Sequence, residues 1–362
     1  MNFTFSDPEK ILFQQMASAL DKSRNHLEKC ACQTEKDIAQ ALHSYNQCLE
    51  PLGYLKHYAD PKSIGPVARL EMMRIFARHQ PSLFLGHESA FRIFPEIFQH
   101  MPDASAFDQN DIGAIAFCED FVETDPKSMQ ISIQKKDTHF IVSGKKSFVM
   151  NAQIASWIAV NGKIDNKTAI LFVSSQSPGI DIVPLQNKHI FSELAMANIT
   201  FTHCSVPINH VIFEASILAQ VQLNEDMAYI ACALGMIDQC IQTATAFTKK
   251  HESEKKPLIA HQAVAFSLAE MVTLKQTAEL LAYRAAWMLA TDNSEKIVLV
   301  NCAKVFCSEA AETIASKSMK ILGGQVFENN HVVEQAFHNS KFLQLAGTST
   351  HLARIAIADV SL

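Results

Sequence analysis

The spacing of apolar positions divides the chain into three parts. Residues 1–110 carry apolar side chains at helical spacing, as in PEKILFQQMASALDKSRNHLEK and PVARLEMMRIFARHQPSLFL. Residues 111–215 change to short β-rich runs, such as HFIVSGKKSFVM and TAILFVSS, separated by turn residues. From about Leu223 the helical period returns and continues to the end of the chain. The pattern predicts an α+β chain with an N-terminal helical domain (1–110), a middle antiparallel β domain (111–215) and a C-terminal helical bundle (216–362).

The predicted bundle contains a segment that is apolar on nearly every side, EDMAYIACALGMIDQCIQTATAFTKK at 225–250. Such a helix is expected to be buried among other helices. It leads into the charged run KKHESEKKP at 249–257, which is typical of a solvated helix end or loop. Farther along, the run LGG at 322–324 predicts a helix end, because glycine is favoured just past a helix C-terminus.

The composition excludes several classes of protein. Hydrophobic residues make up 48% of the chain and charged residues 19%, which is typical of a folded, soluble protein rather than a disordered one. The net charge of −6 is spread along the chain, without a basic stripe for nucleic acid. Because no run of about 18 apolar residues is found and the start does not resemble a signal peptide, we expect no membrane span.

The nine cysteines are odd in number and scattered, without the CxxC pairs that suggest zinc or redox sites. We therefore expect no metal. Unpaired cysteines are typical of a reducing compartment, so we expect a cytoplasmic protein.

Five segments carry a resemblance to a known family. They are SGKKSFVMNAQIASWIAV (143–160), FTHCSVPINHVI (201–212), HQAVAFSLAEM (261–271), ILGGQVF (321–327) and AGTSTHLARIAIA (346–358). None is specific alone. In this order and at this spacing they resemble the acyl-CoA dehydrogenase family over nearly the full length of the chain.

The resemblance implies a four-helix C-terminal bundle and FAD held between the β domain and the bundle. It also implies a homodimer or homotetramer in which the neighbouring subunit contributes to the flavin site. The implied reaction is the α,β-dehydrogenation of an acyl thioester carried by coenzyme A or by an acyl carrier protein, with an electron-transfer flavoprotein as a possible acceptor. This reaction needs a carboxylate to remove the α-proton and FAD to accept the β-hydride.

Two positions for the catalytic base follow from the resemblance. Many members place a glutamate directly before the Gly-Thr of the closing segment, where this chain has Ala346. Others place it on the first bundle helix, ten residues before a glycine, and Glu225 and Gly235 match that spacing. Glu225 is therefore the predicted base. Asn224, Glu225 and Asp226 also fit an ordinary helix start, where the helix dipole would lower the pKa of an acid.

The resemblance also implies residues that contact ligands. Thr124, Ala346 and Gly347 are expected at the acyl thioester. The positions expected at FAD are Phe117, Cys118, Phe148, Met150, His261, Gln262, Leu322, Gly323, Gly324 and Thr348.

Several of these positions depart from the family pattern. A threonine is replaced by Met150, a glycine of the flavin loop by Glu123, and the arginine of a pyrophosphate-binding motif by His251. Loss of a fixed positive charge near a pyrophosphate removes a strong charge-assisted hydrogen bond. These departures leave open a second interpretation: a non-catalytic homologue that acts as a partner subunit, or that binds an acyl thioester with weak or no FAD binding. A third interpretation is a helical scaffold unrelated to flavin.

Overall fold

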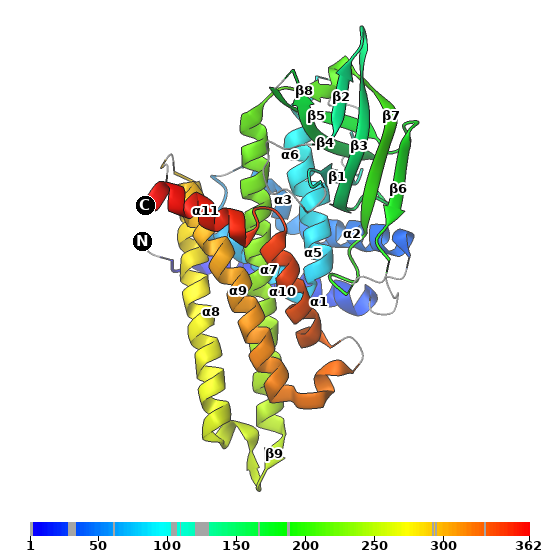
Figure 1. Cartoon of the computed structure of the whole chain (residues 1–362). Helices are drawn as coiled ribbons and strands as arrows, with labels where there is room; N and C mark the ends of the chain where they lie inside the picture. The colour runs from blue at the N-terminus through cyan, green and yellow to red at the C-terminus, as the bar shows by residue number, and fades with distance from the viewer. Residues whose placement is uncertain are drawn as a thin grey trace.

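A computed structural model describes most of the chain. The described residues are 3–27, 34–60, 62–102, 107–108, 110–119, 130–165, 167–186, 189–291, 293, 295–328 and 331–362. The elements follow the order helices, strands, helices (Figure 1).

The N-terminal part is helical up to Phe98. Its helices are α1 (Asp7–Leu27), α2 (Glu35–Leu49), α3 (Tyr54–Ala59), α4 (Pro66–His79), α5 (Pro81–His87), the π-helical segment η2 (Glu88–Ile93) and α6 (Phe94–Phe98). The start of α2 follows from local sequence, because Thr34 and Asp37 form a reciprocal capping box. Segments α5, η2 and α6 run on without a break, and π-helical turns of this kind occur frequently at functional sites.

The middle part forms two four-stranded sheets. Its strands are β1 (Gly113–Ala116), β2 (Ser132–Lys135), β3 (His139–Met150), β4 (Trp157–Ile164), β5 (Lys167–Ser174), β6 (Ile180–Pro184), β7 (Met196–Pro207) and β8 (Val211–Ile212). The sheet β2-β3-β7-β6 is antiparallel throughout, whereas in β1-β4-β5-β8 the strand β1 runs parallel to β4. The prediction of a purely antiparallel domain is therefore wrong at β1. A parallel neighbour requires a long connection, and β2 and β3 lie in the one between β1 and β4.

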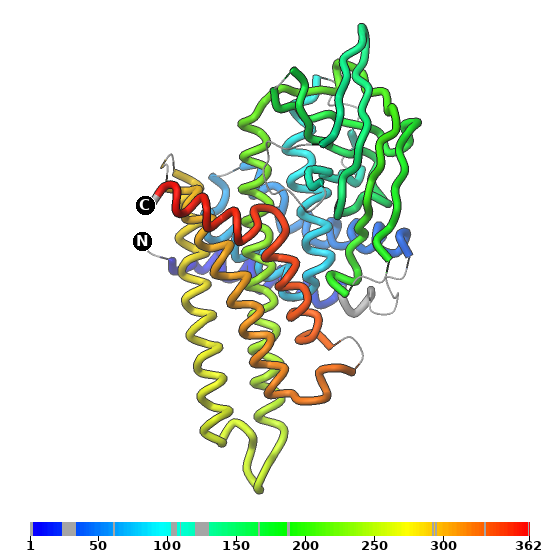
Figure 2. Tube along the Cα trace, viewed as in Figure 1, coloured from blue at the N-terminus to red at the C-terminus, as the bar shows by residue number. Residues whose placement is uncertain are grey.

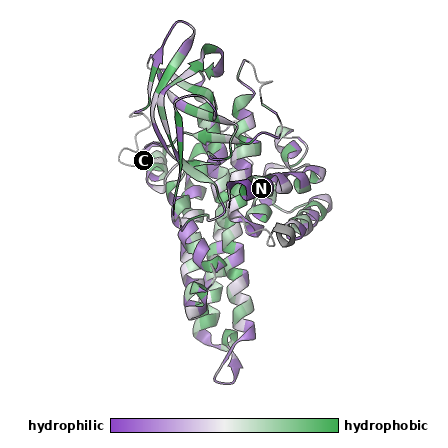
Figure 3. Ribbon diagram, turned by 90° about the vertical axis from the view of Figure 1, so that its right-hand side faces the viewer, coloured by the Kyte–Doolittle hydropathy of each residue, from purple (hydrophilic) through white to green (hydrophobic). Residues whose placement is uncertain are grey.

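The C-terminal part is a bundle of long helices. Its elements are α7 (Ala215–Lys250), the hairpin strands β9 (Glu252–Ser253) and β10 (Lys256–Pro257), α8 (Gln262–Leu289), α9 (Lys296–Leu322), α10 (Val332–Leu345) and α11 (Thr350–Ser361). The trace passes down α7, back along α8 and down α9 (Figure 2). The hairpin at the far end of α7 is exposed and hydrophilic, as predicted for KKHESEKKP (Figure 3).

Helix α7 is the core helix of the bundle. Residues 226–237 are all buried, against α4 on one side and α9 and α10 on others. By length and hydropathy α7 also meets the criteria for a membrane-crossing helix, with 56% of its most apolar window buried. Its packing within the bundle accounts for this apolar character.

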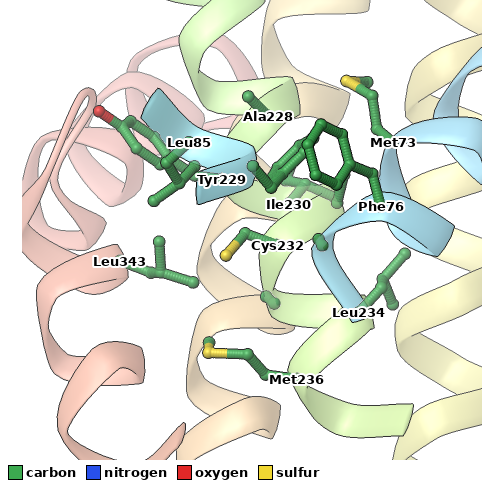
Figure 4. Packing of buried hydrophobic residues seen from close by; sticks show 14 of the residues in the cluster. Met73, Phe76, Leu85, Ala228, Tyr229, Ile230, Cys232, Leu234, Met236 and Leu343 are labelled. Atoms are coloured by element: carbon green, nitrogen blue, oxygen red, sulfur yellow. The ribbon is translucent and has the colours of Figure 1, made fainter. Parts of the chain in front are cut away.

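One hydrophobic core joins the N-terminal helices to the bundle. Figure 4 shows part of it: Met73 and Phe76 of α4 lie on one side of α7, and Leu343 of α10 lies on the other. Met150 and Phe191 from the β domain reach the same core. A second core fills the space between the two sheets. The predicted boundaries at 110 and 215 coincide with changes of element type and stay a prediction as domain boundaries.

Gly235 lies where α4 packs closely against α7. A Cβ at this position would lie 2.6 Å from the backbone nitrogen of Arg78. We expect Gly235→Ala to lower the free energy of unfolding by about 1–3 kcal/mol, because overpacking forces the two helices apart. Urea denaturation measures the change. Gly324→Ala is the matched control, because a Cβ there meets nothing within 4 Å, and a loss as large in the control would contradict the prediction.

Candidate active site

Glu225 lies in the interior of α7. The helix begins at Ala215, ten residues earlier, so residues 224–226 are not a helix start. The interpretation of Glu225 as an ordinary N-terminal acid is therefore wrong, and so is the expectation that the helix dipole lowers its pKa. The dipole acts within the first turn, and Glu225 lies in the third.

Burial instead raises the pKa of Glu225 to about 8, and the neighbouring charge of Asp226 adds to the increase. Lys304 and Arg92 oppose it. The residue as a whole is half-buried. A carboxylate whose pKa lies near neutrality meets one requirement of a general base.

Contacts from the N-terminal helices hold the backbone directly before Glu225. The guanidinium of Arg92 in η2 donates to the carbonyl of Asn224 at 3.2 Å. The side chain of Asn224 donates in return to the Glu96 carboxylate of α6 at 2.6 Å. Arg92 is itself buried and ion-paired with Glu88. These bonds fix the rotation of α7 at Glu225 relative to η2 and α6.

The closing segment forms a turn between α10 and α11 that docks on α7. Thr348 donates to the carboxylate of Asp226 through both its amide, at 3.0 Å, and its hydroxyl, at 2.5 Å. Lys304 of α9 donates to the carbonyls of Ala346 and Thr348, at 2.7 and 3.0 Å. Gln222, one turn before Glu225 on the same helix face, donates to the hydroxyl of Thr348 at 2.9 Å. The structure therefore brings Glu225 and the predicted residues 346–348 together.

Gly347 permits this close docking. Its φ of +61° lies in the left-handed region that favours glycine. A Cβ at this position would lie 2.6 Å from the Asp226 carboxylate and 2.8 Å from the Tyr229 ring. Any side chain here would push the turn away from α7.

The β domain contributes a second group of predicted residues. Ser147 donates its amide to the carbonyl of Cys118 at 2.9 Å, so the end of β1 and the end of β3 are joined. Phe148 lies in a β-bulge with a φ of +55° and donates its amide to Asn198. Met150, two residues on, is buried.

The loop after β1 is anchored by a buried ion pair. Lys146 donates to Glu119 at 2.7 Å and to Asn161 at 2.6 Å. Met150 lies in the core that also contains Tyr229 of α7, and Phe148 packs against that core. Phe117 packs against the hydrophobic core that lies between α6 and the sheet β1-β4-β5-β8.

The remaining predicted FAD residues lie at the far end of the bundle. From Glu225, α7 runs on to Lys250, a length of about 37 Å from the helical rise. His261 caps α8 beyond that point, where its ring bonds the carbonyl of Ser253, and Gln262 follows it. Leu322, Gly323 and Gly324 lie where α9 ends, at the same end of the bundle, so the helix end predicted from LGG is confirmed (Figure 1). Within one chain these residues and Glu225 are not brought together.

The residues described at this end of the bundle could bind FAD through the shape of the backbone and its main-chain groups. A Cβ at Gly323 or Gly324 would meet nothing within 4 Å, so a ligand can approach this backbone closely. His251, which replaces the family's arginine, stacks on Phe247 and bonds its carbonyl. Its ring is therefore engaged by the last turn of α7. Thr124 lies outside the described residues.

Other features of the described chain do not compete with this site. Among the residues that are described, no group of three or more His, Cys, Asp or Glu side chains is placed to hold a metal ion. A shallow groove of about 530 Å³ is lined by α1 residues such as Gln14, Ser18 and Lys22, together with Cys48 of α2. None of the predicted site residues lines it.

Sequence reasoning missed the buried charges of the site. Lys304 is 1% exposed, as is Asp226, and their charged atoms lie 3.7 Å apart. One signal was available: Lys304 shares a helix face with the apolar Val300, Cys307 and Ala311. A lysine on such a face indicates a buried partner. No corresponding sequence signal identified Arg92.

The chain was compared with known proteins. Residues 218–362 match the family model described as acyl-CoA dehydrogenase, C-terminal domain. Benzylmalonyl-CoA dehydrogenase of Aromatoleum aromaticum is 23% identical over 68% of this chain and 67% of its own length. The human mitochondrial short-chain specific acyl-CoA dehydrogenase is 25% identical over 68% of this chain. That alignment spans 62% of the human protein.

Among solved structures, butyryl-CoA dehydrogenase from Megasphaera elsdenii superposes with a TM-score of 0.85. The superposition covers 99% of both chains, at 18% identity. The predicted α+β fold of helical, β and helical parts is confirmed. The match of residues 218–362 argues against the third interpretation, a helical scaffold unrelated to flavin.

Proposed function

Since the chain belongs to the acyl-CoA dehydrogenase family through residues 218–362, we propose that it is an FAD-dependent dehydrogenase of an acyl thioester. One observation carries the proposal: Glu225, whose carboxyl group has a raised pKa, lies on α7 between Gln222 and Asp226, the two residues that bond the docked turn 346–348. The acyl group is carried by coenzyme A or by an acyl carrier protein.

The chain's own residues perform the proton transfer. Glu225 removes the α-proton as a general base, and its pKa near neutrality favours that transfer. The methyl group of Ala346 leaves space for a base that approaches from α7. Burial of Asp226 and Lys304 behind the turn excludes water from that side of the base.

FAD supplies the acceptor for the β-hydride, as it does in homologues of this family. In this chain the β-domain group of Phe117, Cys118, Phe148 and Met150, together with Thr348, would hold the flavin close to Glu225. An electron-transfer flavoprotein is the proposed acceptor of the electrons.

The remote residues support a homo-oligomer. His261, Gln262 and residues 322–324 lie too far from Glu225 to serve its site, so they would serve the site of a neighbouring copy. Helix α8 exposes large apolar side chains, with Phe266 60% and Leu280 59% accessible. We propose a homodimer or homotetramer, in a cytoplasmic location that rests on the scattered cysteines.

Titration of Glu225 predicts the pH dependence of turnover. The carboxylate must be deprotonated to accept a proton, so kcat/KM should rise with pH through a midpoint near the pKa of about 8. Below the midpoint, kcat/KM should change about tenfold per pH unit. A steady-state profile in buffers of constant ionic strength measures it. A flat profile across this range would contradict the assignment of Glu225.

Anaerobic titration of the purified protein tests the function. We expect a yellow protein whose flavin absorbance bleaches when a matching acyl thioester is added. The departures at Met150 and His251 favour the second candidate, a non-catalytic partner subunit or thioester-binding protein. A colourless protein that takes up no FAD on reconstitution would exclude the dehydrogenase and support that candidate.

A further inference from the structure

We propose that Asp226 and Lys304 are positioning residues that clamp the closing turn, residues 346–348, against the base Glu225. This inference rests on the proposed function, because it assigns Glu225 as the base. Neither side chain needs to touch substrate. Both are 1% exposed, and both act through the backbone of the turn.

The two charges, on different helices, bind complementary groups of the turn. Asp226 on α7 accepts both protons that Thr348 can donate, at 3.0 Å from the amide and 2.5 Å from the hydroxyl. Lys304 on α9 donates to the carbonyls on either side of Gly347, at 2.7 and 3.0 Å. The amide of the turn therefore bonds a negative charge, and its two carbonyls bond a positive charge. Charge-assisted bonds of this kind are about twice as strong as neutral ones.

Helix geometry places the clamp beside the base without blocking it. Consecutive residues on an α-helix point about 100° apart, so Asp226 and Glu225 project to different sides of α7. Gln222, whose amide bonds Thr348, lies between those two directions. The turn therefore sits over Gln222, with Asp226 on one side and Glu225 on the other.

The clamp also forms part of the charge environment of Glu225. The groups that face Glu225 are Asp226 and Tyr229 on α7, Lys304 on α9 and Arg92 on η2. Asp226 raises the pKa of Glu225, whereas Lys304 and Arg92 lower it. Removal of the Asp226 charge should therefore lower the pKa of Glu225, and removal of the Lys304 charge should raise it. A purely structural role predicts no such reversal of sign.

The test uses the purified full-length chain and two near-isosteric variants. Infrared difference spectroscopy follows the Glu225 carboxyl group, assigned by the band that Glu225→Gln removes. We expect Asp226→Asn to lower the pKa of Glu225 by about one pH unit or more, and Lys304→Met to raise it similarly. Hydrogen–deuterium exchange of the peptide spanning residues 343–352 should become faster in both variants.

Matched controls come from the ion pair of Glu312 and Lys341, which joins α9 to α10 at 2.7 Å. Glu312→Gln and Lys341→Met make the same chemical changes away from Glu225 and should leave its pKa unchanged. If Asp226→Asn fails to fold, the double variant Asp226→Asn/Lys304→Met buries no unpaired charge. It should show fast exchange of the turn and a lower Glu225 pKa than Lys304→Met alone.

The proposed clamp would be refuted if the two variants shifted the pKa of Glu225 in the same direction or not at all. It would also be refuted if hydrogen–deuterium exchange of the turn were unchanged. These readouts need neither FAD nor turnover. Failure of the wild-type protein to bleach would therefore refute the proposed dehydrogenase while the clamp is judged separately, on titration and exchange.

Discussion

Glu225→Gln should lower the rate of flavin bleaching by an acyl thioester about 10²–10⁴-fold, the usual contribution of a positioned general base. Glutamine keeps the shape of the side chain and its place in the third turn of α7, but it cannot accept the α-proton. Binding of FAD and of the thioester should persist, because the contacts of Asn224 and Asp226 with η2, α6 and the turn are unchanged. Anaerobic stopped-flow absorbance measures the rate.

Glu309→Gln is the matched control for this experiment. Glu309 is an exposed acid of the same bundle, paired with Arg354 at the surface. Its substitution should leave bleaching within about twofold of wild type, since surface ion pairs contribute little. Bleaching of Glu225→Gln at the wild-type rate would exclude Glu225 as the base.

Arg74→Met should lower the free energy of unfolding by about 3–5 kcal/mol, because it removes a buried cation that three acidic side chains share. Asp238 keeps Lys275, at 2.8 Å, as a second cation. Arg74 is 5% exposed and joins three helices. It bonds Asp238 of α7 through two nitrogens, at 2.7 and 2.9 Å, and Glu279 of α8 at 2.9 Å. Its third acidic partner, Glu71 on α4, lies at 3.2 Å. The network ties the N-terminal helices to the bundle close to Gly235.

Chemical denaturation of Arg74→Met, followed by circular dichroism, measures the loss. Arg354→Met is its control, because the Arg354–Glu309 pair is about half exposed, and its loss should cost about 1 kcal/mol or less. Similar values for both variants would show that the buried network adds nothing beyond a surface pair.

Much of the fold follows from local sequence. Helical periodicity identified the helices of both ends, and the glycine rule placed the end of α9 at Leu322. The β-rich runs identified strands such as β3 and β5. The direction of β1 was not predictable, because parallel and antiparallel neighbours share the same side-chain alternation. The long start of α7 was also missed, since the apolar period of 226–237 does not extend to Ala215.

The candidate site shows the same division. The family resemblance, through the spacing of Glu225 and Gly235 and the small residue Ala346, predicts Glu225 as the base, and this assignment stays a prediction. The sequence could not determine its pKa: the same glutamate would be acidic at a helix start and titrates near neutrality in a helix interior. Burial and neighbouring charges decide that value, and both depend on how α7, α9 and η2 pack.

The sequence by itself therefore determined the element types, the family resemblance and the identity of the predicted base, because these depend on residue type and spacing. Only the tertiary structure decided that Asp226 and Lys304 meet at the closing turn, since 78 residues separate them along the chain and the packing of α7 against α9 brings them together. It also decided that His261 and Leu322 lie far from Glu225, because long rigid helices carry them to the opposite end of the bundle.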